Sequence, residues 1–280
     1  MSETNQSATH QQPSENPDSN TDPNPPMIVA RKLRKTYDDF VAVDDIDFEV
    51  RRGEAFGLLG PNGAGKSTTM KMIASVSKRT SGDLRILDKD PNVDGPQIRA
   101  HLGVVPQQDN LDRELKVHEN LFIYGRFFGL GRKFLKAKVE ELLEFAQLTE
   151  KRNSKAEELS GGMKRRLTIA RGLVNEPEIL MLDEPTTGLD PQARHILWDR
   201  LFRLKEQGVT LVITTHYMDE AEQLCDRVAI VEKGKVIAID TPDALIDKLV
   251  ATGFERPKEV KKANLEDVYI QLTGHALRED

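Results

Sequence analysis

A short apolar run followed by a glycine-rich turn is the feature that most restricts the fold of this chain. Phe56-Gly57-Leu58-Leu59 has the length and composition of a buried strand. It leads directly into a turn that matches G-x-x-x-x-G-K-[ST], and a helix-like pattern follows the turn. A strand before the motif and a helix after it are the context in which this motif predicts a phosphate-binding loop. The alternative, a chance glycine turn, would account for neither the strand-like run before the motif nor the helix-like pattern after it.

The turn predicts nucleotide binding through main-chain and side-chain groups together. Its glycines allow backbone N–H groups to surround a phosphate, and a helix N-terminus adds partial positive charge. We expect Lys66 to reach the outer phosphates and the Ser67 hydroxyl to bind Mg²⁺. The predicted nucleotide-binding set here is Gly60, Pro61, Asn62, Gly63, Ala64, Gly65, Lys66, Ser67 and Thr68.

A second chemical element follows the apolar run Ile179-Leu180-Met181-Leu182. Asp183 ends this strand-like segment, where a carboxylate can serve a nucleotide-bound metal. Glu184 stands beside it, where a carboxylate can orient a water molecule and take its proton. The alternative is an acidic turn exposed to solvent, which is disfavoured because both acids lie at the end of an apolar run. We therefore predict Asp183 as a metal ligand and Glu184 as a general base.

Strand-like runs alternate with helical patterns from about Met27 onward, which predicts a mostly parallel sheet covered on both faces. Residues 109–160 contain helical spacing instead and read as an inserted helical subdomain. RVAIVE and KVIAID, joined at Lys233-Gly234, predict an antiparallel element. The expected fold is α/β, of the P-loop NTPase type, over residues 27–245. Residues 1–26 are polar and expected to be disordered, and 246–280 to form a short helical tail with a helix capped by Asn264.

The segment Leu159-Ser160-Gly161-Gly162-Met163 separates the possible classes of nucleotide hydrolase. Its serine and glycines open a second helical run, which creates another helix N-terminus rich in free N–H groups. One chain needs one phosphate cradle for its own nucleotide. Ser160, Gly161 and Gly162 are therefore predicted to contact the nucleotide held by a second copy of the chain.

With these motifs in one order, the chain resembles the ATP-binding cassette family of transporter ATPases. The resemblance implies that Tyr37 stacks on adenine, that Gln107 senses Mg²⁺ and that Asp190 crosses the dimer interface. It also implies that His216, in LVITTHYMDEAE, contacts the γ-phosphate and acts in catalysis with Lys66 and Glu184. An ordinary surface tyrosine and a core histidine are the alternatives for Tyr37 and His216. Gln108 adjoins Gln107, and the choice between them rests on the family pattern.

Further stretches, among them GVVPQQDNLD, ENLFIYGRFFG and DEPTTGLDPQARH, resemble the nodulation-factor export subgroup and related drug-exporter ATPases. The resemblance implies a head-to-tail homodimer that hydrolyses ATP with Mg²⁺ and energises a separate membrane permease. It also implies a cytoplasmic location on the inner face of the membrane, through that permease, and export of a lipo-oligosaccharide or drug-like substrate. The chain departs from the subgroup in having few residues between the Asp243 helix and the final NLEDVY segment.

Composition bears on the competing classes. No run approaches the roughly 18 apolar residues of a membrane span. A net charge of −6 provides no global basic field for nucleic acid, which we do not expect as a partner. The single cysteine, Cys225, predicts a buried side chain in a reducing compartment. A soluble cassette ATPase acting on ribosomes or DNA is the alternative reading. A GTPase or kinase would leave the Ser160–Gly162 segment without a role.

Overall fold

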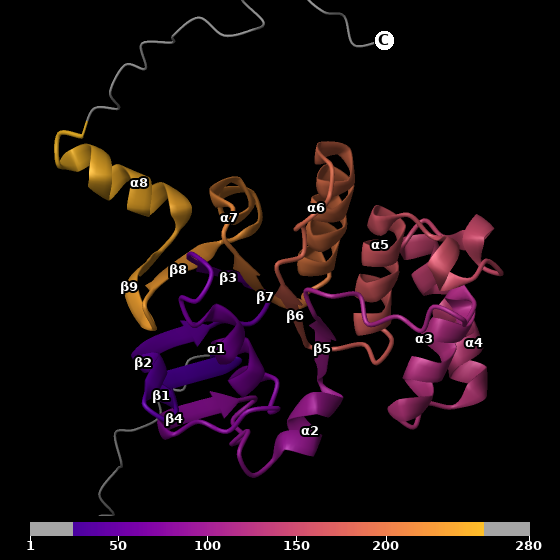
Figure 1. The fold of residues 1–280 in the computed structure, drawn as a ribbon, viewed down its shortest axis with the longest axis horizontal. Helices are drawn as coiled ribbons and strands as arrows, with labels where there is room; N and C mark the ends of the chain where they lie inside the picture. Colours follow the sequence, from indigo (N-terminus) through magenta and orange to yellow (C-terminus); the bar gives the residue numbers. More distant parts are fainter. Residues whose placement is uncertain (1–24, 255–280) are drawn as a thin grey trace, which may run out of the picture. The chain divides into compact units, whose positions relative to one another are not determined.

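The computed structural model describes residues 25–254 (Figure 1). They fall into a body that ends at Pro242 and a separate unit that begins at Asp243. The sequence-based expectations for the first 24 residues, and for the helix capped by Asn264, lie outside the described residues. Helix α8 (Pro242–Ala251) begins at the last residue of the body and continues into the second unit.

A six-stranded sheet forms the centre of the body, in the order β5-β6-β7-β3-β8-β9. Its strands are β5 (Leu102–Val105), β6 (Ile179–Asp183), β7 (Thr210–Thr215), β3 (Ala55–Leu59), β8 (Arg227–Glu232) and β9 (Lys235–Asp240). The first five run parallel, and β9 pairs antiparallel with β8. All side chains of β3 and β7 are buried, as expected of central strands covered on both faces. The mostly parallel sheet and the β8–β9 hairpin confirm the predicted fold.

A second, antiparallel sheet was not foreseen as a separate unit. It contains β1 (Ile28–Tyr37), β2 (Phe40–Val50) and β4 (Ser81–Ile86), in the order β2-β1-β4. The β1–β4 pairing joins segments separated by the whole of β3 and α1 (Lys66–Ile73), so no local turn signals it. The two sheets share one core, in which the rings of Phe48 and Phe56 stack with centroids 5.7 Å apart.

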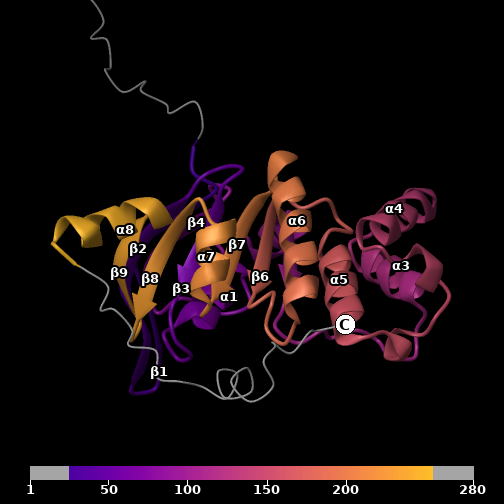
Figure 2. The same cartoon turned by 90° about the horizontal axis from the view of Figure 1, so that it is seen from above.

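Helices cover the parallel sheet on both sides (Figures 1 and 2). Helix α1 contacts both β2 and β6 and so lies between the two sheets. On the opposite face lie α6 (Pro191–Glu206) and α7 (Met218–Leu224). Helix α2 (Gly95–Ala100) lies next to β5, and its Arg99 donates to the Ser75 carbonyl just after α1. Cys225 is buried directly after α7, and burial raises the pKa of its thiol. The prediction of a buried cysteine is confirmed.

The helical insertion contains α3 (Val117–Phe127), α4 (Arg132–Phe145), the short 3-10 turns η1 (Thr149–Lys151) and η2 (Ala156–Glu158), and the start of α5 (Gly161–Gly172). Its apolar side chains do not all have the same role. Leu121 is fully buried in the helical core, whereas Phe127 is 82% exposed. Helix α3 packs against α4 and α5, so it buries Leu121 and leaves Phe127 outside that contact.

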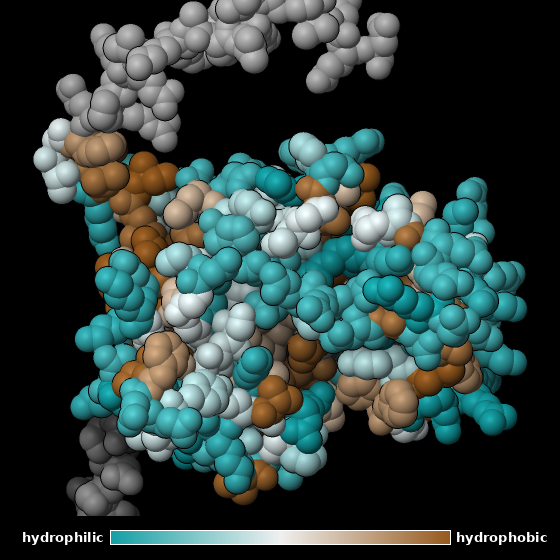
Figure 3. All heavy atoms as spheres, in the orientation of Figure 1, coloured by the Kyte–Doolittle hydropathy of each residue, from teal (hydrophilic) through white to brown (hydrophobic). Residues whose placement is uncertain are grey.

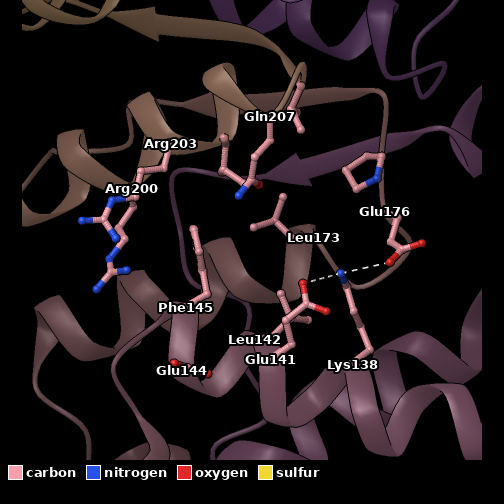
Figure 4. Close-up of a pocket in the computed structure, with 13 residues that line it drawn as sticks. Lys138, Glu141, Leu142, Glu144, Phe145, Leu173, Glu176, Arg200, Arg203 and Gln207 are labelled. Atoms are coloured by element: carbon pink, nitrogen blue, oxygen red, sulfur yellow. Dashed lines mark hydrogen bonds and ion pairs between the residues drawn. The ribbon is translucent and has the colours of Figure 1, made fainter.

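Lys138 connects the helical insertion to the turn between α5 and β6 (Figure 4). Its ammonium lies 2.7 Å from Glu141 and 3.1 Å from Glu176. Burial by itself would lower the pKa of Lys138, but the two carboxylates outweigh it and raise that pKa. The ion pairs border a hollow of about 500 Å³ between α4 and α6. This hollow shares no lining residue with the phosphate-loop pocket described below.

Polar side chains dominate the face shown in Figure 3, and the apolar ones appear there as separate patches. Within residues 25–254, no helix combines the length and apolar character needed to cross a bilayer.

Candidate active site

Four parallel strands deliver the predicted chemical groups to one edge of the sheet. The phosphate loop follows β3, Gln107 follows β5, Asp183 ends β6, and His216 follows β7. Strand register brings them level, since Leu59 pairs with Thr215 and Asp183 with Thr214. Ligands of open α/β sheets bind outside the carboxyl ends of their strands, and this edge is that position.

The phosphate loop depends on glycine at positions where a side chain has no room. A Cβ on Gly60 would collide with the carbonyl oxygen of Val231. Gly65 has φ +102°, and a Cβ there would lie 2.5 Å from the carbonyl oxygen of Ala42. Gly65 is also the residue before α1, so the free N–H groups of the helix open directly toward the loop. This main-chain geometry fits an anion.

Lys66 is a buried cation without a fully paired charge. Its side chain is about 4% exposed, and its Nζ donates to the carbonyl oxygens of Gly60, at 2.6 Å, and Pro61, at 3.0 Å. The carboxylate of Glu184 lies 3.9 Å from Nζ. Burial lowers the pKa of Lys66, against the opposing effect of Glu184 and Asp183. A further anion placed here would stabilise the charged ammonium.

Asp183 and Ser67 face each other across the loop. Ser67 Oγ donates to Asp183 Oδ1 at 3.3 Å, and the Thr214 hydroxyl donates to the same carboxylate oxygen. Thr214 orients the carboxylate, a function that no sequence signal indicated. A hydroxyl and a carboxylate oxygen are hard ligands of the type that Mg²⁺ prefers, so these residues fit the expected ion.

Glu184 lies at the centre of the predicted catalytic residues. Its side chain is 9% exposed, and its backbone has φ +47°, an unusual left-handed conformation of the kind that clusters at functional sites. The Nε2 of Gln107 donates to Glu184 Oε2 at 3.1 Å, and the Thr187 hydroxyl donates to the same oxygen at 3.2 Å. His216 Nδ1 lies 3.3 Å from Glu184 Oε1. The tertiary structure thus brings Gln107, Glu184, His216 and Lys66 together.

A pocket of about 300 Å³ opens over these groups. It is lined by Phe40, Ala42, residues 62–68, Gln107 and Glu184. Phe40, which the sequence analysis missed, is 64% exposed, and β1–β2 register pairs it with Tyr37. Tyr37 is 43% exposed but does not line this pocket, and Lys35 lies over its ring. Phe40 is thus a second candidate for contact with the base.

The Ser160–Gly162 segment does not line this pocket. Ser160 is the N-cap of α5, and its hydroxyl accepts a hydrogen bond from the Met163 N–H at 3.3 Å. Ser160 and Gly161 are exposed. Asp190 similarly caps α6 by accepting from the Ala193 N–H at 2.8 Å. Neither segment lines the pocket over the chain's own phosphate loop.

Comparison with known proteins agrees with this arrangement. Residues 43–187 match the ABC transporter family, a stretch that contains the phosphate loop, Gln107, Ser160–Gly162 and the Asp183–Glu184 pair. The chain belongs to the ATP-binding cassette transporter family. It is an ABC ATPase subunit that binds ATP.

Curated relatives place this ABC ATPase among exporter subunits. The Nod factor export ATP-binding protein I of Burkholderia lata is 50% identical over 299 aligned residues, covering 90% of this chain and 98% of that protein. The protein of the same name from Bradyrhizobium diazoefficiens is 51% identical over 216 residues, covering 77% of this chain and 71% of that protein.

Solved structures share the fold of this ABC ATPase. cbiO1 of Clostridium perfringens, part of the transporter complex cbiONQ, is 29% identical with a TM-score of 0.74, covering 81% of this chain and 94% of that one. The ATP-binding cassette MJ0796, solved as a dimer with ADP and Pi, is 29% identical with a TM-score of 0.71, covering 77% and 99%.

Proposed function

We propose that this ABC ATPase powers export through a separate membrane permease, and that its substrate is a lipo-oligosaccharide or a drug-like amphipathic molecule. The supporting observation is the 50% identity to the Burkholderia lata Nod factor export protein over 98% of that protein's length. The geometry at the carboxyl edge of the parallel sheet supports the ATPase part of the proposal, residue by residue.

In this proposal Lys66 binds the outer phosphates of ATP, because its buried ammonium lacks a full counter-charge. Ser67 and Asp183, with Gln107 beside them, would hold Mg²⁺, which supplies charge neutralisation on the phosphates. Glu184 acts as general base: it orients the attacking water and accepts its proton. Gln107 donates to Oε2 of the Glu184 carboxylate, and His216 Nδ1 lies 3.3 Å from its Oε1. Tyr37 and Phe40 are the aromatic groups available for adenine.

Two copies of the chain would complete each site head-to-tail. The open N-terminus of α5 at Ser160–Gly162 is exposed and is absent from the lining of the chain's own pocket. A helix N-terminus attracts anions, so it suits the γ-phosphate held by a second copy. Asp190 would lie at the same interface. The dimeric state of the ATP-binding cassette MJ0796 is consistent with such an arrangement.

The permease is the proposed membrane partner, and the chain would attach through it to the cytoplasmic face of the membrane. The transporter complex that contains cbiO1 is a precedent among the structural relatives. The alternative of a cassette ATPase acting on ribosomes or DNA gains no support from relatives named for export.

The test combines attachment with transport. The chain is expressed with and without a candidate permease, and both membrane sedimentation and lipo-oligosaccharide export from cells are measured. We expect attachment and export only when both chains are present. Lys66→Ala should remain attached and lose export, which separates docking from ATP use. Sedimentation with membranes in the absence of the permease would contradict the proposed attachment, and export unaffected by Lys66→Ala would contradict its energising role.

A further inference from the structure

Arg165 is a buried guanidinium that the proposed reaction does not yet use. It lies in the first turns of α5, five positions after Ser160, and is 7% exposed. Arginine is rarely buried to this degree unless its charge and its donors are satisfied. The acceptors of its N–H groups therefore indicate which segments Arg165 holds in place.

The guanidinium donates to two separate loops of the active site. Nε donates to the Pro185 carbonyl at 2.7 Å, and Nη2 to the Asp183 carbonyl at 3.1 Å. Nη1 donates to the Pro106 carbonyl at 2.5 Å, with a longer contact of 3.4 Å to that of Gln107. The first two acceptors flank Glu184 in the chain. The others belong to the loop that carries the Gln107 side chain.

Gln107 and Glu184 are joined by a side-chain hydrogen bond. The planar guanidinium of Arg165 therefore binds the main chain beside both partners of that bond. The side-chain bond measures 3.1 Å between Gln107 Nε2 and Glu184 Oε2, and Arg165 holds the main chain on each side of it. Burial lowers the pKa of Arg165 to about 10, against the opposing effects of Glu220, Asp183 and Asp109, so the group remains charged at neutral pH. A lysine could keep the charge but could not reproduce a planar set of donors.

Helix α5 lies between α6 and the pair of helices α3 and α4 in both views (Figures 1 and 2). Its first turn is the Ser160–Gly162 segment, which we place against the nucleotide of a second copy. A displacement of this turn would move Arg165, which lies on the same short helix. The two active-site loops would follow, since their carbonyl groups are bound to its guanidinium.

We propose that Arg165 is a positioning residue for ATP hydrolysis: it sets the spacing between Gln107 and Glu184 and links that spacing to the start of α5. The inference deepens the proposed function and rests on Glu184 as general base. Arg165 does not line the pocket over the phosphate loop. Its effect is on how well the base is placed, and misplacement by about 1 Å can reduce a rate about 10²-fold.

The experiment compares Arg165→Lys with the parent chain in steady-state ATP hydrolysis. We expect kcat to fall about 10- to 100-fold while KM for ATP stays within about 3-fold, because the phosphate loop is intact. Arg227→Lys is the matched control. It also removes a partly buried guanidinium, paired with Glu54, but it does not contact either active-site loop, so kcat should stay within about 2-fold.

A double-mutant cycle distinguishes positioning from a general loss of stability. If Arg165 acts through the Gln107–Glu184 spacing, Arg165→Lys combined with Gln107→Ala should reduce kcat far less than the product of the two single effects. Thermal unfolding of each variant identifies the temperatures at which it is folded. Arg165→Gln, which reaches at most one of the two loops, replaces the lysine variant if that variant does not fold.

The outcomes separate this inference from the function on which it rests. Multiplicative effects in the cycle, or a folded Arg165→Lys with unchanged kcat, overturn the role of Arg165 while leaving Glu184 as base. If Glu184→Gln retains normal turnover, both the assigned base and the role of Arg165 are wrong. A KM that rises while kcat is preserved places Arg165 in nucleotide binding and also overturns positioning.

Discussion

Glu184 illustrates how an active-site residue depends on its immediate neighbours. Its carboxylate is buried and accepts hydrogen bonds from Gln107 and Thr187, with His216 Nδ1 3.3 Å away. Its backbone takes a left-handed conformation that non-glycine residues rarely adopt. An amide with the same shape would keep several of these contacts but could not accept a proton. The side chain can therefore be tested with little structural change.

Glu184→Gln should retain ATP affinity and slow hydrolysis by about 10²–10⁴-fold, the usual effect of losing a general base. Equilibrium nucleotide binding checks the affinity, and initial hydrolysis rates on the same preparation check the turnover. Glu176→Gln, an exposed glutamate whose partner is Lys138, provides the control and should leave turnover within about 2-fold. Near-normal turnover by Glu184→Gln would remove Glu184 from the base role.

Lys66 tests the phosphate-binding half of the site. Its ammonium is buried in the loop, and truncation would remove the charge-assisted contact that we propose it makes with the phosphates. Lys66→Ala should therefore reduce ATP binding at least about 100-fold, as titration calorimetry or a fluorescent nucleotide would show. Unchanged affinity in a folded variant would mean that the nucleotide binds elsewhere.

At the scale of elements, the antiparallel sheet is secured near the start of β4 by a two-pronged ion pair. Arg79 donates to both carboxylate oxygens of Asp90, at 2.6 and 2.8 Å, and both side chains are largely buried. The hydrogen bonds from Arg79 are the main reason that the pKa of Asp90 falls to about 2. Planar, bidentate pairs of this kind are among the stronger charge-assisted contacts.

A folded-state pKa below the usual value of 3.8 means that Asp90 stabilises the fold above about pH 4 and loses this effect as the pH falls toward 2. Asp90→Asn should therefore cost about 1–2 kcal/mol of unfolding free energy at pH 7. The difference between variant and parent should shrink progressively below pH 4. Urea unfolding from pH 7 to pH 3 measures it. The control is Asp83→Asn, which removes an exposed partner of Arg85 and should cost under about 0.5 kcal/mol of unfolding free energy at every pH. If the cost of Asp90→Asn does not depend on pH, the lowered pKa of Asp90 is not its cause.

At the scale of the whole molecule, the ATP-binding groups and the Ser160–Gly162 segment sit on different parts of one chain. The pocket above the phosphate loop has no lining residue from this segment. A second copy is the economical way to supply the missing N–H groups. The proposal thus makes hydrolysis a property of a pair of chains.

With Mg²⁺ and ATP, Glu184→Gln should elute as a dimer in gel filtration, and as a monomer without nucleotide, because bound ATP would join the two copies. Adding Gly161→Asp should abolish the dimer by placing a carboxylate against the phosphates. Gly161 has open space around its Cβ position and begins α5, where an acidic residue is favourable for the helix. The double variant should therefore fold normally. A dimer that survives Gly161→Asp would place the interface elsewhere.

The elements that could be predicted from sequence are those whose causes are local. The short apolar runs Phe56–Leu59 and Ile179–Leu182 lie in β3 and β6, and the hairpin at Lys233-Gly234 has the expected bounds. The local motif predicted the glycines at positions 60 and 65, but the carbonyl groups of Val231 and Ala42 that crowd them come from distant parts of the chain. Leu121, by contrast, looks like Phe127 in sequence, and only packing decided that one is buried and the other exposed.

The sequence by itself determined the parallel α/β core, the phosphate loop, the acidic strand end and the family, because each depends on residues adjacent in the chain. Only the tertiary structure revealed the β1–β4 pairing, Phe40 over the pocket, Thr214 on Asp183 and Arg165 across two loops. These depend on strand register and on the direction in which buried side chains point. A hydrogen bond between residues tens of positions apart leaves no periodic trace in the sequence, because it is set by where the sheet brings the two segments together.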